Sequence, residues 1–345
     1  MFAERVLSGM RPTGLLHLGH YHGVLKNWVK LQNEFPCLFF VADWHALTTH
    51  YETPEVIKEN VWDMVVDWLA AGVDPEKATL FVQSKVPEHA ELHLLLSMNT
   101  PLSWLERVPT YKDQQEKLSD KDLGTYGFLG YPLLQSADIL IYRATQVPVG
   151  EDQVPHIELT REIARRFNHF YSKEKLLNAK GAEIGRKPIL LEPKALLTEA
   201  SKMPGLDGFK MSKSYQNTLA LRETPENISQ KVRKMPTDPA RVRRTDPGDP
   251  SKCPVWPLHE VYSDASTKQW VQEGCKSAGI GCIQCKEPII QAITDELAPM
   301  RERAAMYTEN PTLVRKIISE GCERARAMAN DTMKDVRKHM GLDYS

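Results

Sequence analysis

Short apolar runs alternate with amphipathic stretches through the first half of the chain. The runs at residues 6–8, 37–42 and 79–82 have the length and composition of buried β-strands. The stretches at residues 17–33 and 54–71 carry apolar positions at helical spacing. Strands that alternate with helices of this length predict a parallel sheet covered on both faces. We therefore expect an α/β fold built on a doubly wound parallel sheet.

The ends of the predicted strands are the first candidate binding positions. In open parallel sheets, ligands bind beyond the carboxyl ends of the strands, where the strand order reverses. The loops that follow Leu7, Ala42 and Val149 occupy such positions in the predicted sheet. We expect a ligand site to be built from these loops.

The pattern changes at about Thr218, where long polar helical segments replace the short apolar runs. The predicted helices cover residues 228–234, 289–308 and 311–339. Residues 235–252 are rich in proline, aspartate and arginine, which is typical of a loop. The second part of the chain is therefore predicted to be all-helical.

Length and composition are those of an ordinary globular protein. The chain has 345 residues, enough for two domains, with 41% hydrophobic and 26% charged residues. Its formal net charge of −1 does not indicate a nucleic-acid partner, although a whole-chain total can hide a local basic surface. No apolar run is long enough to cross a bilayer, and the first residues lack the layout of a signal peptide. We expect a cytoplasmic protein without a membrane partner.

Two histidines stand at the start of the first predicted helix. His17 and His20 follow the first strand and enclose Gly19. Backbone N–H groups and the helix dipole favour an anion at such a position, and both imidazoles can donate to a phosphate in a transition state. Gly19 lets a flat base or a ribose approach the backbone closely. Taken alone, a pair of surface histidines on an ordinary helix fits this segment equally well.

Two lysines belong to the segment Lys-Met-Ser-Lys-Ser at residues 210–214, after a loop with glycine and proline at residues 203–209. Lys210 and Lys213 on a flexible loop can close over a triphosphate and neutralise the leaving pyrophosphate. A solvated basic loop is the commoner interpretation of an isolated lysine pair.

Together the two segments resemble the paired motif of class I aminoacyl-tRNA synthetases. His17-Leu18-Gly19-His20 is similar to the His-Ile-Gly-His element, and residues 210–214 match the Lys-Met-Ser-Lys-Ser element letter for letter. The resemblance implies activation of an amino acid with ATP and Mg²⁺. It also implies a Rossmann-like catalytic domain over residues 1–217 and a helical tRNA anticodon-binding domain over residues 218–345, whose last helix packs back on the first domain. The catalytic residues would be His17, His20, Lys210 and Lys213.

Asp138 points to the amino acid that is activated. It lies among apolar residues on a predicted helix, where a carboxylate without a partner is costly. An indole N–H only donates, so a buried acceptor suits tryptophan, and an unpaired Asp138 would penalise phenylalanine. Val147 and Val149 alternate along a predicted strand and offer an apolar face to a flat ring. The alternative is that Asp138 caps a helix or forms a salt bridge within the fold.

The segments around Asp138 and at residues 146–153 resemble those of bacterial tryptophanyl-tRNA synthetases, and the resemblance extends through nearly the whole chain. It implies L-tryptophan and tRNA(Trp) as substrates and a homodimer. Asp138 would accept the indole hydrogen, and Tyr131 with Gln153 would hold the α-ammonium group. The implied tryptophan pocket consists of Leu7, Gly9, His45, Tyr131, Gln135, Asp138, Val147, Val149 and Gln153.

The same resemblance implies an ATP site. Asp152, with the backbone of Gly150 and Glu151, would contact the adenylate, and Lys112 would reach the phosphates. The full implied set is Arg11, Pro12, Thr13, Gly19, His20, Gly150, Glu151, Asp152, Met203, Lys210, Met211, Ser212, Lys213 and Ser214.

Three other functions compete with a tryptophan–tRNA ligase. A tyrosyl-tRNA synthetase shares the fold, but a phenol hydroxyl both donates and accepts, whereas this pocket offers one buried acid flanked by valines. A synthetase-like regulator that binds RNA or tryptophan without catalysis would keep the same fold. A small adenylyltransferase shares the histidine motif but typically lacks the lysine loop.

Four of the six cysteines are concentrated in the helical part: Cys253, Cys275, Cys282 and Cys285. Four thiolates can hold Zn²⁺ or an iron–sulfur cluster, and the residues themselves do not decide between the two. The spacing resembles a subgroup of tryptophanyl-tRNA synthetases with a [4Fe–4S] cluster in the anticodon-binding domain, and we expect the cluster on that resemblance. Cys37 and Cys322 are predicted to be buried core thiols.

Residues 210–252 hold a local positive excess, with ten Lys or Arg against five Asp or Glu. Such a segment can follow a phosphate backbone, although any one of these side chains fits a solvated charged face equally well. The predicted RNA contacts are Lys231, Arg233, Lys234, Arg241, Arg243 and Arg244.

Overall fold

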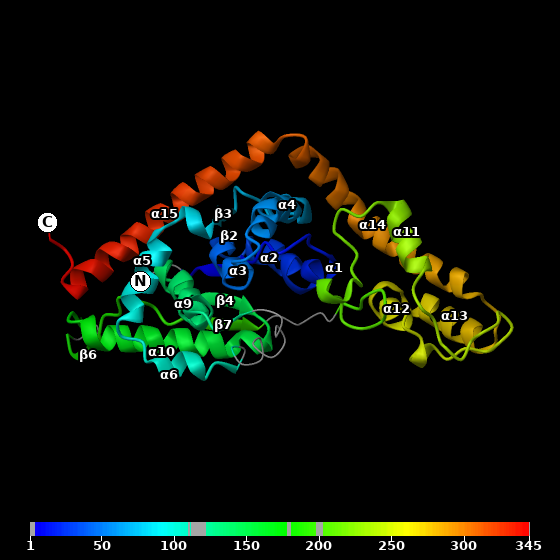
Figure 1. The fold of residues 1–345 in the computed structure, drawn as a ribbon, viewed down its shortest axis with the longest axis horizontal. Helices are drawn as coiled ribbons and strands as arrows, with labels where there is room; N and C mark the ends of the chain where they lie inside the picture. Colours follow the sequence, from blue (N-terminus) through cyan, green and yellow to red (C-terminus); the bar gives the residue numbers. More distant parts are fainter. Residues whose placement is uncertain (1–3, 110, 112–121, 178–180, 198–202, 345) are drawn as a thin grey trace.

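The structure is a computed structural model that describes residues 4–109, 111, 122–177, 181–197 and 203–344, without the side chains of Ile184 and Ser214. A five-stranded parallel sheet forms its centre, in the order β3-β2-β1-β4-β7 (Figure 1). The strand order reverses between β1 and β4, so the predicted doubly wound α/β fold is confirmed. The strands are β1 (Val6–Met10), β2 (Cys37–Val41), β3 (Ala78–Val82), β4 (Gln146–Val149) and β7 (Lys194–Leu197).

Side chains that alternate along the strands enter two separate cores. Val6 and Phe39 belong to the core that contains α4 (Glu55–Ala71). Leu7 and Phe40 belong to the opposite core, which includes residues of three helices. Both faces of the sheet are therefore covered, which explains why all five residues of β2 are apolar and buried. The three helices are α5 (Glu88–Ser97), α9 (Tyr131–Ile141) and α10 (Val154–Tyr171).

The first predicted helix is not a continuous α-helix. It begins as α1 (Leu18–His20), widens into a π-helical segment at Tyr21–Leu25 and continues as α2 (Lys26–Leu31). Periodicity alone does not reveal a π segment, because one wider turn shifts the apolar stripe only slightly. Such segments are frequent at functional sites, and this one directly follows the paired histidines.

Several short elements were not predicted. Helices α3 (Asp43–His50), α6 (Leu102–Glu106) and α8 (Tyr126–Leu129) lie in the first half of the chain. Strands β5 (Lys175–Leu177) and β6 (Glu183–Arg186) pair antiparallel as a separate two-stranded sheet. Short elements contain too few residues to show a clear hydrophobic period.

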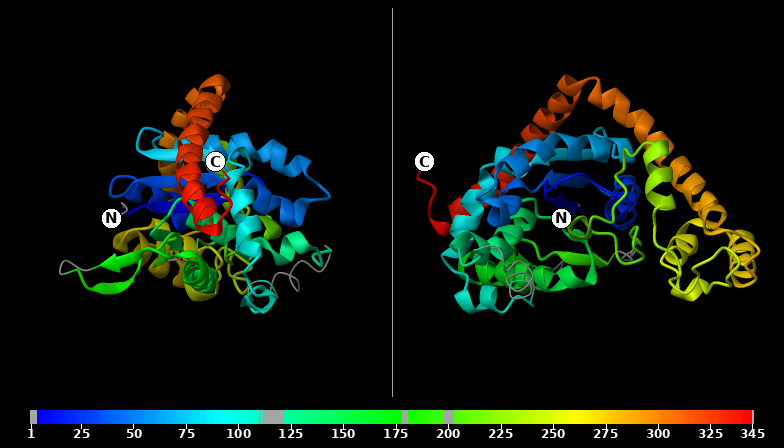
Figure 2. Two further views of the ribbon diagram at one scale, coloured as in Figure 1. Left: turned by 90° about the vertical axis from the view of Figure 1, so that its left-hand side faces the viewer. Right: turned by 45° about the vertical axis from the view of Figure 1, so that its right-hand side comes forward.

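Two long helices dominate the second half. Figures 1 and 2 show α14 (Cys282–Thr308) and α15 (Pro311–Met340) meeting at an angle beside the sheet. Three shorter helices pack against α14, on the part of that helix that lies away from α15 (Figure 1). They are α11 (Pro225–Arg233), α12 (Trp256–Tyr262) and α13 (Ala265–Lys276). Among the described residues, no helix is long and apolar enough to cross a membrane.

Helix α15 returns to the sheet and packs on β3 and α5. Arg326 donates to Glu88 at 2.9 Å and Arg337 to Glu91 at 2.6 Å, so two ion pairs fix α15 on α5. The helix thereby covers the edge strand β3, which protects the unpaired edge of the sheet.

Close packing of α15 on β3 depends on Gly321. A Cβ atom at this position would lie 1.7 Å from the carbonyl oxygen of Leu80, which is backbone and cannot rotate away. We predict that Gly321→Ala lowers the free energy of unfolding by about 2 kcal/mol or more, because overpacking forces the helix off the strand.

Chemical denaturation measures this effect, with Ser319→Ala on an exposed turn of the same helix as the matched control. In a free helix, Gly→Ala stabilises by about 1 kcal/mol. A Gly321→Ala protein that is as stable as Ser319→Ala, or more stable, would contradict the packing argument.

Candidate functional site

The carboxyl ends of β1 and β4 open into a cavity of about 580 Å³. This is the position that the sheet order predicts, because the strand sequence reverses between these two strands. All nine residues predicted for the tryptophan pocket line it: Leu7, Gly9, His45, Tyr131, Gln135, Asp138, Val147, Val149 and Gln153.

A second cavity of about 330 Å³ adjoins the first and shares Thr13, Gly19, His20 and Lys210 with it. His17 lines the second cavity together with the lysine loop. The two cavities contain most of the predicted ATP-site residues, namely Arg11, Thr13, Gly19, His20, Gly150, Met203, Lys210, Met211, Ser212 and Lys213.

Some predicted ATP-site residues lie elsewhere. Pro12 is buried, and Glu151 and Asp152 line neither cavity. The Asp152 carboxylate instead accepts a hydrogen bond from Gln153 Nε2 at 2.9 Å. Lys112 and the side chain of Ser214 fall outside the described part of the chain.

The hydrogen bonds of the paired histidines define their tautomers. The Gly19 N–H donates to His17 Nδ1 at 3.1 Å, and the His17 N–H donates to His20 Nδ1 at 3.2 Å. A ring nitrogen that accepts carries no proton, so each neutral ring has its proton on Nε2. The two rings, whose centroids are 3.9 Å apart, therefore each offer one Nε2–H donor.

Both histidines are neutral near pH 7. Burial lowers the pKa of His17 to about 4, with a further lowering by Lys213. Burial lowers the pKa of His20 to about 2, with His17 and Lys213 adding to the effect. The pair can thus support a phosphate by hydrogen bonding, while the positive charge at the two cavities comes from Arg11 and from the lysine loop.

Asn217 organises the lysine loop. Its Oδ1 accepts from the Ser212 N–H at 2.8 Å, and its Nδ2 donates to Asp207 at 2.7 Å and to the carbonyl of Lys210 at 3.2 Å. The side chain is buried, so these bonds hold both halves of the loop in one conformation. Lys213 Nζ donates to the carbonyl of Gly14 at 2.8 Å, which ties the loop to the histidine segment.

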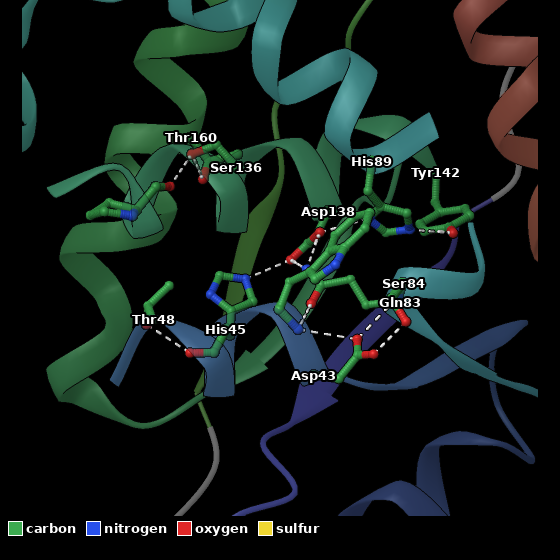
Figure 3. A network of polar contacts seen from close by, with 12 residues as sticks. Asp43, His45, Thr48, Gln83, Ser84, His89, Ser136, Asp138, Tyr142 and Thr160 are labelled. Carbon is green, nitrogen blue, oxygen red and sulfur yellow. Dashed lines mark hydrogen bonds and ion pairs between the residues drawn. The ribbon is translucent and has the colours of Figure 1, made fainter. Parts of the chain in front are cut away.

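Asp138 is fully hydrogen-bonded within the fold. Its carboxylate accepts from His45 Nε2 at 2.8 Å, from His89 Nδ1 at 2.6 Å and from Gln83 Nε2 at 2.9 Å (Figure 3). The salt bridge within the fold, which the sequence left open as an alternative, is therefore present, and the predicted bond to an indole N–H stays a prediction. These bonds lower the pKa of Asp138 to about 2 even though burial acts in the opposite direction.

Sequence reasoning did not identify Gln83, His89 or Asn217. Gln83 directly follows β3, so the rule that functional loops lie at carboxyl strand ends could have found it. His89 is the second residue of the next helix, and Asn217 follows the lysine motif, where no local pattern marks them.

The helical part contains a second group of polar contacts. His259 Nε2 lies 3.3 Å from Cys285 Sγ, and Arg241 Nη1 lies 3.9 Å from Cys275 Sγ. Within the described ranges, no three His, Cys, Asp or Glu side chains are arranged to hold a single metal ion. Arg241 was predicted to contact RNA, but it is only 8% exposed and its guanidinium donates to the carbonyl of Ile280, so that prediction is wrong.

Comparison with known proteins gives a consistent result. Residues 3–298 match the family described as tRNA synthetases class I (W and Y). The chain is 61% identical over 400 aligned positions to the tryptophan–tRNA ligase of Ralstonia nicotianae, with 100% of both chains covered. It is 52% identical over 342 positions to that of Thermotoga maritima, covering 99% of this chain and 100% of that one.

A solved structure supports the same relationship. Tryptophanyl-tRNA synthetase from Campylobacter jejuni, complexed with ADP and tryptophan, superposes with a TM-score of 0.84 at 31% identity. The match covers 98% of this chain and 100% of the other.

The sheet order and the converging motifs define a class I aminoacyl-tRNA synthetase, and the family match extends over most of the chain. Within that class, the chain belongs to the tryptophan–tRNA ligases, an enzyme family. The predicted fold and the predicted ligase function are therefore confirmed. They are favoured over a tyrosyl-tRNA synthetase, a non-catalytic regulator and a small adenylyltransferase.

The charge on Lys213 gives a pH-dependent prediction. Burial lowers its pKa to about 8, Asp67 opposes this shift and Arg11 adds to it. A lysine is charged below its pKa, so kcat/KM for ATP, which reports ionisations of the free enzyme, should fall as the pH rises through about 8. The neutral histidines should cause no change between pH 5.5 and 7.

Lys213→Arg provides the comparison, because arginine stays charged throughout this range. We expect this variant to keep its kcat/KM for ATP flat to at least one pH unit higher than the wild type, whatever its absolute rate. Superimposable profiles for the two proteins would show that Lys213 does not cause the alkaline fall.

Proposed function

We propose that the two cavities bind L-tryptophan and ATP side by side and catalyse two successive transfers. In the first, a carboxylate oxygen of tryptophan bonds to the α-phosphorus of ATP, the bond to the bridging oxygen breaks, and pyrophosphate leaves. In the second, a hydroxyl oxygen of the terminal ribose of tRNA(Trp) bonds to the tryptophanyl carbonyl carbon, the bond from that carbon to the phosphate oxygen breaks, AMP leaves and the hydroxyl proton is released to solvent. The substrate supplies its own nucleophile, so no covalent enzyme intermediate is required.

One observation carries this proposal. The nine residues of the expected tryptophan pocket line one cavity, and the paired histidines and the lysine loop line the adjoining one. An amino acid and a triphosphate bound in these cavities would meet at the shared wall of Thr13, Gly19, His20 and Lys210. Holding both reactants in one orientation is the main requirement of such a transfer.

We assign each residue a role that follows from its side-chain chemistry. The Nε2–H groups of His17 and His20 donate to phosphate oxygens, and Lys210 with Lys213 neutralises the leaving pyrophosphate. Tyr131 and Gln153 hold the α-ammonium group, and Val147 with Val149 packs against the ring. Gly150 leaves room for the adenylate next to the strand end.

Mg²⁺ is expected with ATP in this class of enzyme. Asp138 is the one carboxylate among the described residues that line the two cavities, and its oxygens are already occupied. We therefore propose that Mg²⁺ enters on the phosphates of ATP, where it neutralises charge, rather than on a protein carboxylate.

Amino-acid-dependent exchange between pyrophosphate and ATP tests the proposed function. We expect exchange with tryptophan, and none above background with tyrosine or phenylalanine. Lys210→Ala should lower kcat by about 10²–10³-fold, because it removes charge from the developing pyrophosphate. Lys173→Ala, an exposed lysine away from both cavities, is the matched control.

Equal exchange with tyrosine would contradict the assigned substrate. No exchange with any amino acid, together with retained tryptophan binding, would favour a regulator.

We also propose that residues 218–345 bind tRNA and that the enzyme is a cytoplasmic homodimer. The predicted basic side chains other than Arg241 support the first part, although Lys231 and Arg233 already pair with Glu223 and Glu287. Support for a dimer comes from three large apolar side chains that are more than half exposed on α5 and α6 or between them: Leu94, Met98 and Leu102.

We further propose that the four clustered cysteines hold a [4Fe–4S] cluster. The thiols of Cys253, Cys275 and Cys282 all act on Cys285, whose pKa burial and these neighbours raise to about 12, so the four lie in one neighbourhood. Four thiolates can hold either Zn²⁺ or an iron–sulfur cluster. The cluster is proposed on the resemblance of the cysteine spacing, and it would supply a rigid cross-link.

Cys282→Ser tests this proposal. The expected result is loss of bound iron and of the cluster's visible absorption, with tRNA charging reduced more strongly than adenylate formation. Cys322→Ser, which changes a thiol outside the group, should keep the iron. Equal loss of both reactions, or zinc without iron in wild-type protein isolated without oxygen, would contradict it.

A further inference from the structure

The carboxylate expected to accept from the indole N–H is already fully hydrogen-bonded within the fold. Asp138 Oδ1 accepts from His89 and Gln83, and Oδ2 accepts from His45 and Gln83 (Figure 3). A carboxylate offers about four lone-pair positions, so four contacts fill it. An indole N–H can reach this carboxylate only if one present donor leaves.

Two of the three donors are locked. His89 has a fully buried side chain, and its Nε2 is bonded to the Tyr142 hydroxyl at 2.7 Å. Gln83 is fully buried, contacts both carboxylate oxygens, and accepts from the Trp44 N–H at 3.2 Å. Moving either side chain would break bonds on both of its sides.

His45 differs from both. It lines the tryptophan cavity, and 12% of its side chain is exposed. Among the described residues, Asp138 is the only group that hydrogen-bonds its ring, through Nε2. The ring can therefore leave at the cost of a single hydrogen bond, and the cavity gives it room to turn.

We propose that His45 is a specificity-determining residue that occupies the indole acceptor in the free enzyme and is displaced by the substrate. This inference rests on the proposed function. Tryptophan replaces one N–H donor on Asp138 by another, so the buried charge keeps its partners. Phenylalanine offers no donor, so displacing His45 would leave Asp138 one partner short, which we expect to weaken binding by about 100-fold or more.

The exchange also explains why a buried carboxylate survives without substrate. An empty acceptor on a group that is 1% exposed would destabilise the free enzyme, and His45 removes that cost. The histidine is thus a substitute donor that tryptophan alone replaces without loss.

Nitrogen-15 spectra of histidine-labelled full-length enzyme test the displacement directly. Comparison with His45→Leu and His89→Gln assigns the two rings. We expect tryptophan, added without ATP, to shift the His45 Nε2–H resonance away from its carboxylate-bonded position. The His89 resonance serves as the internal control and should remain hydrogen-bonded. An unchanged His45 resonance at saturating tryptophan, verified by calorimetry, would overturn the inference while leaving the proposed function intact.

Binding measurements give an independent test. In His45→Leu the indole no longer has to displace a donor, so we expect tryptophan to bind about three- to tenfold more tightly. A sulfur isostere, 3-benzothienyl-L-alanine, has no N–H and should bind at least tenfold more weakly than tryptophan to the wild type and to this variant.

Weaker tryptophan binding by His45→Leu would mean that the ring contacts the bound substrate and is not displaced. Equal affinity for tryptophan and the isostere would mean that Asp138 does not receive the indole N–H. No binding or exchange with tryptophan would overturn the proposed function and this inference together.

Discussion

The buried negative charge of Asp138 is the constraint on which the active-site half of the molecule depends. A carboxylate inside a core survives only if its oxygens are fully hydrogen-bonded, and removing a partner from such a group is strongly destabilising. Here the donors come from α3, from the turn after β3 and from α5, and the Tyr142 hydroxyl supports one of them. The charge on α9 therefore holds two strand-to-helix connections, β2 to α3 and β3 to α5, in one arrangement. The same arrangement forms the floor of the larger cavity.

The phosphate side of the site uses a different division of labour. In the proposed function, two neutral histidines, oriented by backbone N–H donors, would donate directed hydrogen bonds to phosphate, whereas the lysines of a separate loop would provide charge. Separating the two functions has a physical advantage. Burial that keeps the imidazoles neutral also disfavours the charge of a lysine, as the lowered pKa of Lys213 shows, so it suits neutral donors better than cations. Asn217 holds the lysine loop in the conformation that the structure shows.

The long helices connect this site to the rest of the chain. Glu296 of α14 accepts from His22 at 2.9 Å and from Lys26 at 2.8 Å, so the helical part is bonded to the segment that directly follows the paired histidines. Helix α15 then crosses back to cover β3 and pairs with α5, which carries His89. The second half of the chain is thus attached to the first beside the paired histidines and on α5, and α14 also packs on α4.

The sequence by itself determined the alternation of strands and helices, the position of the cavity and the class of chemistry, because these depend on residues that are close along the chain. Hydrophobic periodicity predicts the helices and strands. The site is then expected at the carboxyl ends of the strands that contain Leu7 and Val149, because ligands bind at such ends in parallel sheets. Only the tertiary structure decided the partners of Asp138, which lie 49, 55 and 93 residues away, and the burial of Arg241 under the loop that contains Ile280. Charge, tautomer and exposure depend on neighbours in space, and local sequence does not record which distant segments become those neighbours.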